Sequence, residues 1–177
     1  MAANPSTRNI PVEIVRKLLR YDPETGHLYW RESRGRIAAG MVAGTVKSDR
    51  GYISVRIDGV TYYGHRLAWA LQTGKQVPDG REIDHKDGSP SNNAWRNLRI
   101  ASPIQNKRNM VPSSLNTSGT TGVTFRKSRN KWQAQMSVGN KLKYLGTFDT
   151  KEDAIAARHK AEREVFGEFA YSERIAR

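Results

Sequence analysis

Residues 111–120, with the sequence VPSSLNTSGT, are the feature that most restricts how this chain can fold. The segment contains proline, serine, asparagine, threonine and glycine and almost none of the residues that build a core. Such a composition is typical of a linker. We therefore expect a larger domain over residues 1–110 and a smaller one over residues 121–177, each with a small hydrophobic core of its own.

The charge of the chain indicates a polyanionic partner. Its 177 residues include 30 Lys and Arg against 17 Asp and Glu, a formal net charge of +13. Both halves of the chain share the excess, so it is not a basic tail on a neutral domain. Nucleic acid is the polyanion that such a protein most often binds. The alternative is a basic soluble protein without such a partner.

Composition also excludes several classes of protein. The chain has no cysteine, which rules out disulfides, thiolate zinc sites and a cysteine nucleophile and fits a reducing compartment. Its first twenty residues lack the apolar core of a secretory signal. No segment approaches the roughly 20 apolar residues of a membrane span. We therefore expect a cytoplasmic protein without a membrane partner.

Periodic patterns predict a helix, a β-meander and a second helix in the first domain. Apolar residues at helical spacing in PVEIVRKLLR predict a helix that ends at Tyr21. HLYWR reads as a short strand, and GYISVRIDGVTYYG alternates like two strands joined at Asp58-Gly59, a strong hairpin signal. GHRLAWALQTG then predicts a short helix that Gly74 closes.

The pattern behind the linker is simpler. TGVTFRKS, KWQAQMSVG and KLKYLGTFD predict three strands, the last two joined at Gly139-Asn140. Thr150 and Asp153 form a capping box at the start of a helix that Gly167 ends. A small three-stranded antiparallel sheet packed on one helix is a minimal α+β domain.

Residues 81–109 carry the candidate chemistry. Their pattern predicts a strand over Glu82–His85, a polar loop, a second strand that contains Leu98 and Ile100, and then a helix. Ser102-Pro103 is an N-cap residue followed by proline at the first helical position, so Asn106 lies in the first turns of this helix. The order is strand, loop, strand, helix.

Three residues of this segment suit metal-dependent hydrolysis of a phosphodiester. Asp84 offers a carboxylate and Asn106 an amide oxygen, and both suit Mg²⁺ or Mn²⁺. His85 can deprotonate water at neutral pH because an imidazole titrates at about 6.5. Adjacent strand residues face opposite sides, so His85 needs a twist or a strand-end position to share a cleft with Asp84.

The spaced pattern of DH at 84–85, NN at 92–93, NLR at 97–99 and QN at 105–106 resembles the HNH endonuclease family. The likeness is to the phage and intron-homing branch, in which the last motif residue is Asn and not a metal-binding His. HRLAWAL and YDPETGHLYW also look like the beginning of such phage proteins, so the resemblance covers residues 10–110. It implies a ββα-metal fold that cleaves double-stranded DNA in the host cytoplasm.

The resemblance assigns a role to each motif residue. It implies that His85 is the general base that activates water. Asp84 and Asn106 are then the ligands of a divalent metal, Mg²⁺ or Mn²⁺. Asn97 is the central Asn, which braces the loop and orients His85 through hydrogen bonds.

For several residues a structural role competes with a functional one. Arg99 either contacts a DNA phosphate or lies on a solvated strand face. His65 is more typical of a packed residue at a helix start than of a catalytic one. A turn role for Asp87 is at least as well supported as an approach to the metal. His27 and His159 are expected on the surface.

The last part of the chain resembles the APETALA/ethylene-response-factor DNA-binding domain, over about residues 119–170. The matching words are GV at 122–123, KWQA at 131–134, LGTF at 145–148 and EDA at 152–154. The resemblance implies a sheet that lies in the DNA major groove. The implied DNA-contacting residues are Arg126, Arg129, Lys131, Trp132, Gln133, Gln135, Lys141 and Lys143. For Trp132 the alternative is a place in the core.

Three functions are therefore compared. The first is a phage-encoded, homing-type endonuclease, expected to be a monomer. The second is a DNA-binding regulator that keeps the fold without cleavage. The third is a function on RNA, which we disfavour because duplex RNA hides its deep major groove from side chains.

Overall fold

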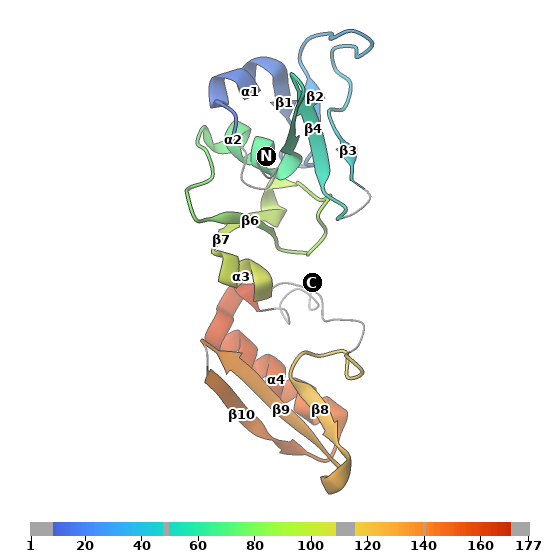
Figure 1. Cartoon of the computed structure of the whole chain (residues 1–177), viewed down its shortest axis with the longest axis vertical. Helices are drawn as coiled ribbons and strands as arrows, with labels where there is room; N and C mark the ends of the chain where they lie inside the picture. Colours follow the sequence, from blue (N-terminus) through green and yellow to red (C-terminus); the bar gives the residue numbers. More distant parts are fainter. Residues whose placement is uncertain (1–8, 48–49, 109–115, 140, 171–177) are drawn as a thin grey trace. The chain divides into compact units, whose positions relative to one another are not determined.

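The computed structural model describes residues 9–47, 50–108, 116–139 and 141–170 (Figure 1). The chain divides into two compact units, Met1–Asn106 and Lys107–Arg177. Both combine helices with small antiparallel sheets, so the α+β class expected from the sequence is confirmed. Among the described residues, no helix has the length and apolar character needed to cross a membrane.

The described residues of the first unit form three small antiparallel sheets and three α-helices. In chain order its elements are α1 (Val12–Leu18), β1 (Leu19–Tyr21), β2 (Leu28–Trp30), β3 (Thr45–Val46), β4 (Ile53–Ile57), β5 (Val60–Tyr63), α2 (Gly64–Thr73), β6 (Glu82–His85), a 3₁₀ turn (Trp95–Asn97), β7 (Leu98–Ala101) and α3 (Pro103–Arg108). The sheets have the orders β1-β2, β3-β4-β5 and β6-β7.

The first helix ends three residues earlier than its pattern predicts. Helix α1 stops at Leu18, and β1 follows at once and pairs with β2, with Leu19 opposite Trp30. Both side chains are buried, at 0% and 5% exposed. The extended backbone gains ladder hydrogen bonds and places Leu19 in the core, and this non-local pairing outweighs the local helical pattern.

Two local predictions in this unit are confirmed. Strands β4 and β5 are joined at Asp58-Gly59, where both residues have positive φ, as a tight hairpin of this type requires. Helix α2 ends at Gly74, which has a φ of 69° and donates its backbone N–H to the carbonyl of Ala70. A left-handed glycine satisfies the last carbonyls of the helix, as expected.

The core of the first unit has two parts. One lies between α1, the strands β1, β2 and β4 and helix α2, and it includes the fully buried Val15, Leu19 and Val55. The other places helix α2 on the β6–β7 hairpin through Ala68, Val77, Ile83 and Leu98. Helix α2 belongs to both parts and therefore fixes the hairpin that carries Asp84-His85.

The turn between β1 and β2 packs directly on the loop that follows β6. Gly26 has a φ of +79°, and a Cβ built there would lie 2.3 Å from the backbone of Asn93 and Ala94. The backbone N–H of Trp95 donates to the carbonyl of Pro23 at 2.8 Å. Only glycine allows both the left-handed backbone and this close approach.

We expect Gly26→Ala to destabilise the protein more than the matched variant Gly40→Ala. Gly40 has a similar φ of +84° but nothing within 4 Å of its added Cβ. Gly40→Ala should therefore cost only the left-handed penalty of about 1–2 kcal/mol. Gly26→Ala adds a backbone collision to the same penalty. Urea unfolding of both variants measures the difference, and equal costs would contradict the contact.

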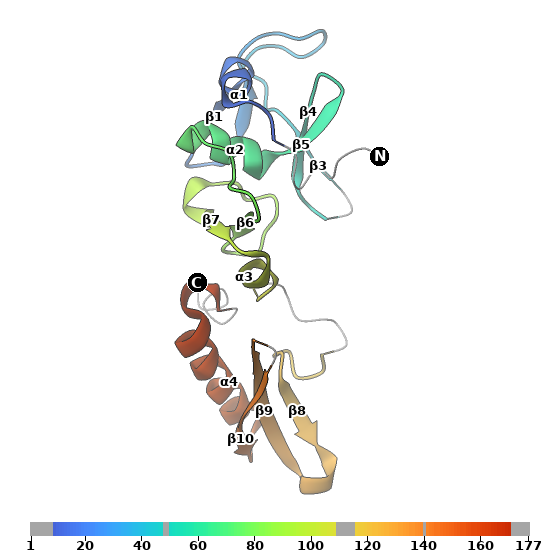
Figure 2. The same ribbon diagram turned by 60° about the vertical axis from the view of Figure 1, so that its left-hand side comes forward.

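The second unit is a three-stranded sheet with one long helix on one face (Figures 1 and 2). Its sheet has the order β10-β9-β8. Its elements are β8 (Val123–Arg126), a 3₁₀ turn (Lys127–Arg129), β9 (Lys131–Val138), β10 (Lys141–Phe148), α4 (Lys151–Phe166) and a final 3₁₀ turn (Gly167–Phe169). The capping box is confirmed, because Thr150 accepts the backbone N–H of Asp153 at 3.1 Å. Gly167 ends α4, as expected.

Two segments expected to be turns or linker lie partly outside the described residues. Asn140 of the Gly139-Asn140 turn is one of them, and so are residues 111–115 of the expected linker. The rest of that linker is ordered by its own side chains. Asn116 accepts the backbone N–H and the hydroxyl of Ser118, at 3.1 and 2.7 Å, and Ser118 is buried.

Candidate active site

Strand β6 carries Asp84 and His85 in a hairpin that is buried on both faces. Ile83, Asp84 and His85 are 6%, 3% and 5% exposed. The register pairs Asp84 with Arg99 and His85 with Leu98, so the two residues lie on opposite faces of the hairpin. His85 is the last residue of β6. It therefore has the strand-end position that we expected it to need in order to share a cleft with Asp84.

A buried asparagine holds the ring of His85. The Nε2 of His85 lies 3.0 Å from Oδ1 of Asn93, which is 2% exposed. An amide oxygen only accepts, so this bond selects the tautomer in which Nε2 carries the proton and Nδ1 the lone pair. Burial lowers the pKa of His85, partly offset by this hydrogen bond and by the charges of Asp87 and Asp84. Burial therefore favours the neutral form of the ring.

Asn97 braces the loop between β6 and β7. Its Nδ2 donates to Oδ1 of Asp87 at 2.9 Å and to the carbonyl of Asn92 at 2.7 Å, and its Oδ1 accepts the backbone N–H of Asp87 at 3.0 Å. Burial raises the pKa of Asp87, but hydrogen bonds from Ser89, Asn92 and Asn97 outweigh it and lower the pKa overall. These hydrogen bonds of Asn97 fix the loop, whereas the hydrogen bond to His85 comes from Asn93.

Asp84 and Arg99 form a buried ion pair. The Nε and Nη2 of Arg99 both donate to Oδ2 of Asp84, at 2.8 and 2.7 Å. Arg99 is 9% exposed. The expectation of a solvated strand face for Arg99 is therefore wrong, because the side chain turns inward to neutralise the carboxylate. A buried carboxylate without such a partner would be unstable.

Asn106 lies on the face of the hairpin that carries Asp84. Its Nδ2 donates to Oε2 of Glu82 at 2.6 Å, and Glu82 is two residues before Asp84 on the same strand. Residues two apart on a strand share a face. Ser102 caps helix α3 as expected and accepts the backbone N–H of Gln105 at 3.2 Å. The two expected metal ligands thus come from strand β6 and helix α3, which are linked by the hydrogen bond between Asn106 and Glu82.

The donor set fits a hard divalent cation that keeps most of its waters. One carboxylate and one amide oxygen are ligands that Mg²⁺ and Mn²⁺ accept. Among the described residues, no three His, Cys, Asp or Glu side chains are grouped to hold a metal.

A pocket of about 340 Å³ opens beside these residues. Helix α3 contributes Pro103 and Asn106, strand β6 contributes Glu82 and Ile83, and α2 contributes His65 and Arg66. The remaining lining residues are Arg50, Tyr52, Tyr63, Gly80 and Arg81. The pocket combines three arginines with two tyrosines, and such a wall suits a polymer that is both anionic and aromatic.

His65 reaches this pocket from the start of helix α2. Its ring centroid lies 5.2 Å from that of His85, edge to face, and 5.4 Å from Tyr63, which it stacks against. The side chain is 7% exposed, and its Nδ1 has no hydrogen-bond partner in the described part of the chain. Burial, and then the charges of His85 and Arg66, lower its pKa well below the ordinary value. The packed role expected for His65 is confirmed.

The expected DNA-contacting residues of the second unit divide between the two faces of its sheet. Gln133 pairs with Thr147 on β10 and with Thr124 on β8, and Gln135 pairs with Tyr144. This face is opposite the buried Ala134 and Met136. We call it the open face, because helix α4 packs on the Ala134 side. Its residues are Thr124, Arg126, Lys131, Gln133, Gln135, Ser137, Leu142, Tyr144 and Thr147.

The open face contains a polar pocket of about 260 Å³. Arg126 donates its Nε to Oε1 of Gln133 at 2.8 Å, and Arg129 lies beside them. The pocket is completed by Ser128 and Thr147. Lys131 is close by on the same face and forms an ion pair with Asp149.

Three of the expected DNA-contacting residues lie on the helix side of the sheet. Trp132 packs against the core of Val123, Ala134 and Ala154, so the alternative of a core role is the one that its packing supports. Lys141 pairs with Val138 and Lys143 with Met136, which also face α4. A bulge between Tyr144 and Gly146 shifts the register and reverses which residues face the helix.

The comparisons with known proteins agree on the first unit. The family model described as HNH endonuclease matches residues 62–108, which run from β5 to the end of α3. Protein 3.8 of Escherichia phage T7 is 36% identical over 106 residues, which cover 60% of this chain and 86% of that protein. This chain belongs to the HNH endonuclease family.

Two further HNH proteins match over about half of their own length. An HNH endonuclease of Acanthamoeba polyphaga mimivirus is 31% identical over 111 residues, which cover 63% of this chain and 57% of that protein. The solved structure of the HNH homing endonuclease I-HmuI is similar over 56% of this chain and 55% of its own, with 24% identity and a TM-score of 0.42. Neither match spans the whole relative.

Sequence reasoning gave no separate role to Asn93, whose side chain forms a hydrogen bond with His85. The Asn92-Asn93 pair was visible in the motif, but the loop geometry decides which amide reaches His85. A second residue it missed is Tyr21, whose hydroxyl donates to the carbonyl of Asn93 at 2.7 Å. Seventy-two positions separate these two, so no local pattern could reveal the contact.

We expect Asn93→Ala to lower kcat by about 10–100-fold, because partners that orient a ligand or base typically contribute that much. KM should change little, since Asn93 is buried and does not line the pocket. Asn93→Asp keeps an oxygen that accepts from Nε2 and should recover most of the rate, whereas Asn93→Leu should not. Steady-state kinetics on a DNA substrate measures this, and equal rates for Asp and Leu would contradict it.

Proposed function

We propose that this protein is a metal-dependent endonuclease that hydrolyses phosphodiester bonds of double-stranded DNA. The observation that carries the proposal is the buried His85 at the end of β6, whose ring is held by Asn93. Asp84 precedes it on the same strand, and Asn106 of helix α3 lies on the face of the hairpin that carries Asp84. A histidine fixed in one tautomer, in a hairpin that also carries a carboxylate, suits hydrolysis more than binding.

In the proposed reaction His85 accepts a proton on Nδ1 from a water molecule. The hydroxide oxygen forms a bond to phosphorus, one phosphorus–oxygen ester bond breaks, and the leaving sugar oxygen takes a proton from solvent. When bound, a divalent cation polarises the phosphate and stabilises the leaving oxygen. Asp84 and Asn106 would hold that cation, and Asn97 keeps the loop between β6 and β7 in place.

The second unit would add DNA affinity and register. We propose that Arg126, Arg129, Lys131, Gln133 and Gln135 contact DNA, because all five lie on or beside the open face. Arg126 and Arg129 share a pocket of the size and polarity that suit a phosphate group. Trp132, Lys141 and Lys143 are left out of this surface, because their register places them on the helix side.

The sequence of Protein 3.8 supports the further proposal of a phage-encoded enzyme, which would act as a monomer in the host cytoplasm. A homing-type enzyme would cut near its own gene. The most direct substrate is therefore the genomic DNA that neighbours the gene, and mapping of the cut ends would give the site and the strand.

Removal of the metal tests the proposed chemistry. Purified protein treated with EDTA is expected to bind a DNA duplex but not to cut it, and Mg²⁺ or Mn²⁺ should restore cleavage. The loss is expected because a divalent cation would polarise the phosphate and stabilise the leaving oxygen. Ca²⁺ in place of Mg²⁺ is a control for ionic strength. Cleavage at the full rate in EDTA would contradict a metal-dependent reaction.

A catalytically inactive DNA-binding protein is the second candidate. The observation that favours it is the Arg99 guanidinium on Asp84, because a cation next to a carboxylate lowers its affinity for a second cation. This candidate predicts salt-dependent DNA binding with no cleavage in any divalent metal. The same chelation experiment separates the two functions.

A further inference from the structure

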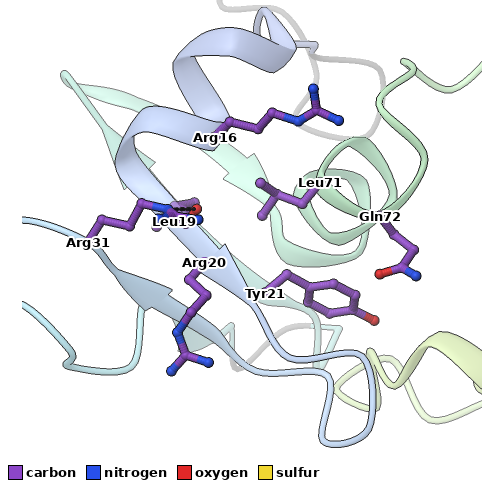
Figure 3. A pocket seen from close by; sticks show the side chains of 7 residues that line it. All are labelled: Arg16, Leu19, Arg20, Tyr21, Arg31, Leu71 and Gln72. Carbon is purple, nitrogen blue, oxygen red and sulfur yellow. Dashed lines mark hydrogen bonds between the residues drawn. The ribbon is translucent and has the colours of Figure 1, made fainter.

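The first unit contains a second basic pocket, away from the β6–β7 hairpin. It has a volume of about 280 Å³ and lies between α1, β1, β2 and α2 (Figure 3). Three arginines line it, one from α1 (Arg16), one from β1 (Arg20) and one after β2 (Arg31). We call this site the arginine pocket. Its other lining residues are Leu19, Tyr21, Leu71 and Gln72.

No carboxylate lines the arginine pocket, and none of its three guanidinium groups forms an ion pair in the described part of the chain. Asp22 is near enough for Arg20 to lower its pKa, but the Asp22 carboxylate accepts the backbone N–H groups of Glu24 and Thr25. Figure 3 shows the three guanidinium groups on different sides of the pocket, so they form a basic surface around it, and such a surface attracts an anion from solution.

Two of the three arginines are fixed by contacts other than ion pairs. Arg31 donates its Nε to the carbonyl of Leu19 at 3.0 Å, which leaves the two Nη groups for a ligand (Figure 3). The guanidinium of Arg20 lies 4.3 Å from the ring centroid of Tyr29. Such contacts orient a guanidinium without neutralising it, and a planar fork of donors matches the oxygens of a phosphate group.

Tyr21 connects the arginine pocket to the residues that hold His85, the proposed general base. This tyrosine lines the pocket, and its hydroxyl donates to the carbonyl of Asn93 at 2.7 Å. Burial raises the pKa of Tyr21, so the hydroxyl keeps its proton and remains a donor. The side chain of Asn93 accepts from His85. A ligand in the arginine pocket would therefore contact the same part of the fold, Tyr21 and Asn93, that orients His85.

We propose that the arginine pocket binds a phosphate of the DNA backbone at a distance from the cleaved bond. The inference rests on the proposed function, which supplies DNA as the ligand. All three arginines are exposed, so the pocket is open to a polymer that runs across the surface. A phosphate held there fixes the position of the duplex relative to His85, since backbone contacts set register and not sequence preference.

Two matched double variants test the proposal in the full-length chain. Arg16→Gln with Arg20→Gln removes two charges from the pocket and leaves Arg31 on Leu19. Arg36→Gln with Arg56→Gln removes two charges from exposed residues of the same unit that do not line it. Both are made in a His85→Ala background, so that a mixed-sequence DNA duplex is bound and not cut. Thermal unfolding checks that both variants fold.

The pocket variant is expected to lose about 10-fold or more in DNA affinity, with the slope of log affinity against log salt reduced by about 0.9, the value for one phosphate contact. The control pair should lose less than about threefold at the same salt concentration, because diffuse charges are screened. In the cleaving background KM for DNA should rise for the pocket variant more than for the control.

Each other outcome has a defined meaning. Equal losses of DNA affinity in the two double variants would overturn the proposal that the arginine pocket binds a phosphate. The proposed function would still stand if the parent protein binds DNA. No DNA binding by the parent protein would overturn both. A loss confined to an RNA duplex of the same length would replace DNA by RNA as the ligand. Thermal stabilisation by inorganic phosphate, with no loss of DNA affinity, would assign the pocket to a small anion.

Discussion

Replacement of His85 by alanine is expected to lower the rate of DNA cleavage by about 10²–10⁴-fold, the usual contribution of a general base. The ring is held by Asn93 beside Asp84, and no second histidine is placed with a similar bond in the described residues. DNA affinity should change little, because His85 is 5% exposed and does not line the pocket. Single-turnover cleavage with Mg²⁺ and a binding assay without it measure the two effects.

Loss of the ring also leaves the buried Oδ1 of Asn93 without its donor, which costs about 1–3 kcal/mol of stability. His85→Gln is therefore the second variant, because its amide N–H can still donate to Asn93. The exposed His27 supplies the control, His27→Ala, which should cleave like the parent protein. A folded His85→Gln variant that cleaves at the parental rate would exclude His85 as the base.

Removal of the Asp84 carboxylate should have the largest effect on stability. Asp84→Ala leaves the guanidinium of Arg99, which is 9% exposed, without the oxygen to which its Nε and Nη2 donate. Breaking a buried pair from one side typically costs about 3–5 kcal/mol, because the remaining charge loses its counter-charge in a site away from water. Urea unfolding measures the loss of stability. Arg99→Met should cost a similar amount, because it removes the cation that neutralises the buried Asp84 carboxylate.

The double variant Asp84→Leu with Arg99→Met separates the structural role of Asp84 from its role as a ligand. It removes both charges, so most of the lost stability should return. Cleavage should stay absent at any Mg²⁺ concentration if Asp84 holds the metal. A stable double variant that cleaves DNA would show that Asp84 is needed only to pair with Arg99.

The local elements of the site could be predicted because they depend on neighbours in the chain. Strand β6 follows the pattern of Glu82–His85, and Ser102-Pro103 starts α3 through the chemistry of its own cap. The hairpin at Asp58-Gly59 needs only two residues that tolerate positive φ. Caps and tight turns are satisfied within a few residues, so the sequence contains all of their partners.

The face of the sheet on which a side chain lies, and the residues it contacts there, were less predictable because both depend on the register of the strands. One bulge in β10 turns Lys141 and Lys143 to the helix side, although both were expected to contact DNA. Trp132 was also expected to contact DNA, and its place beside the core follows from the same register. A shift of one residue exchanges the two faces of a strand, and no composition rule fixes that shift.

Asp84-His85 and the spacing to Asn97 and Asn106 were determined by the sequence alone, together with the family that they indicate. The tertiary structure decided what holds them. Asn93 and not Asn97 bonds to His85, Arg99 turns inward to Asp84, and Tyr21 supports the loop across 72 positions. The reason is burial: a polar group removed from water must find a partner, and the nearest partner in space is set by packing and not by chain order.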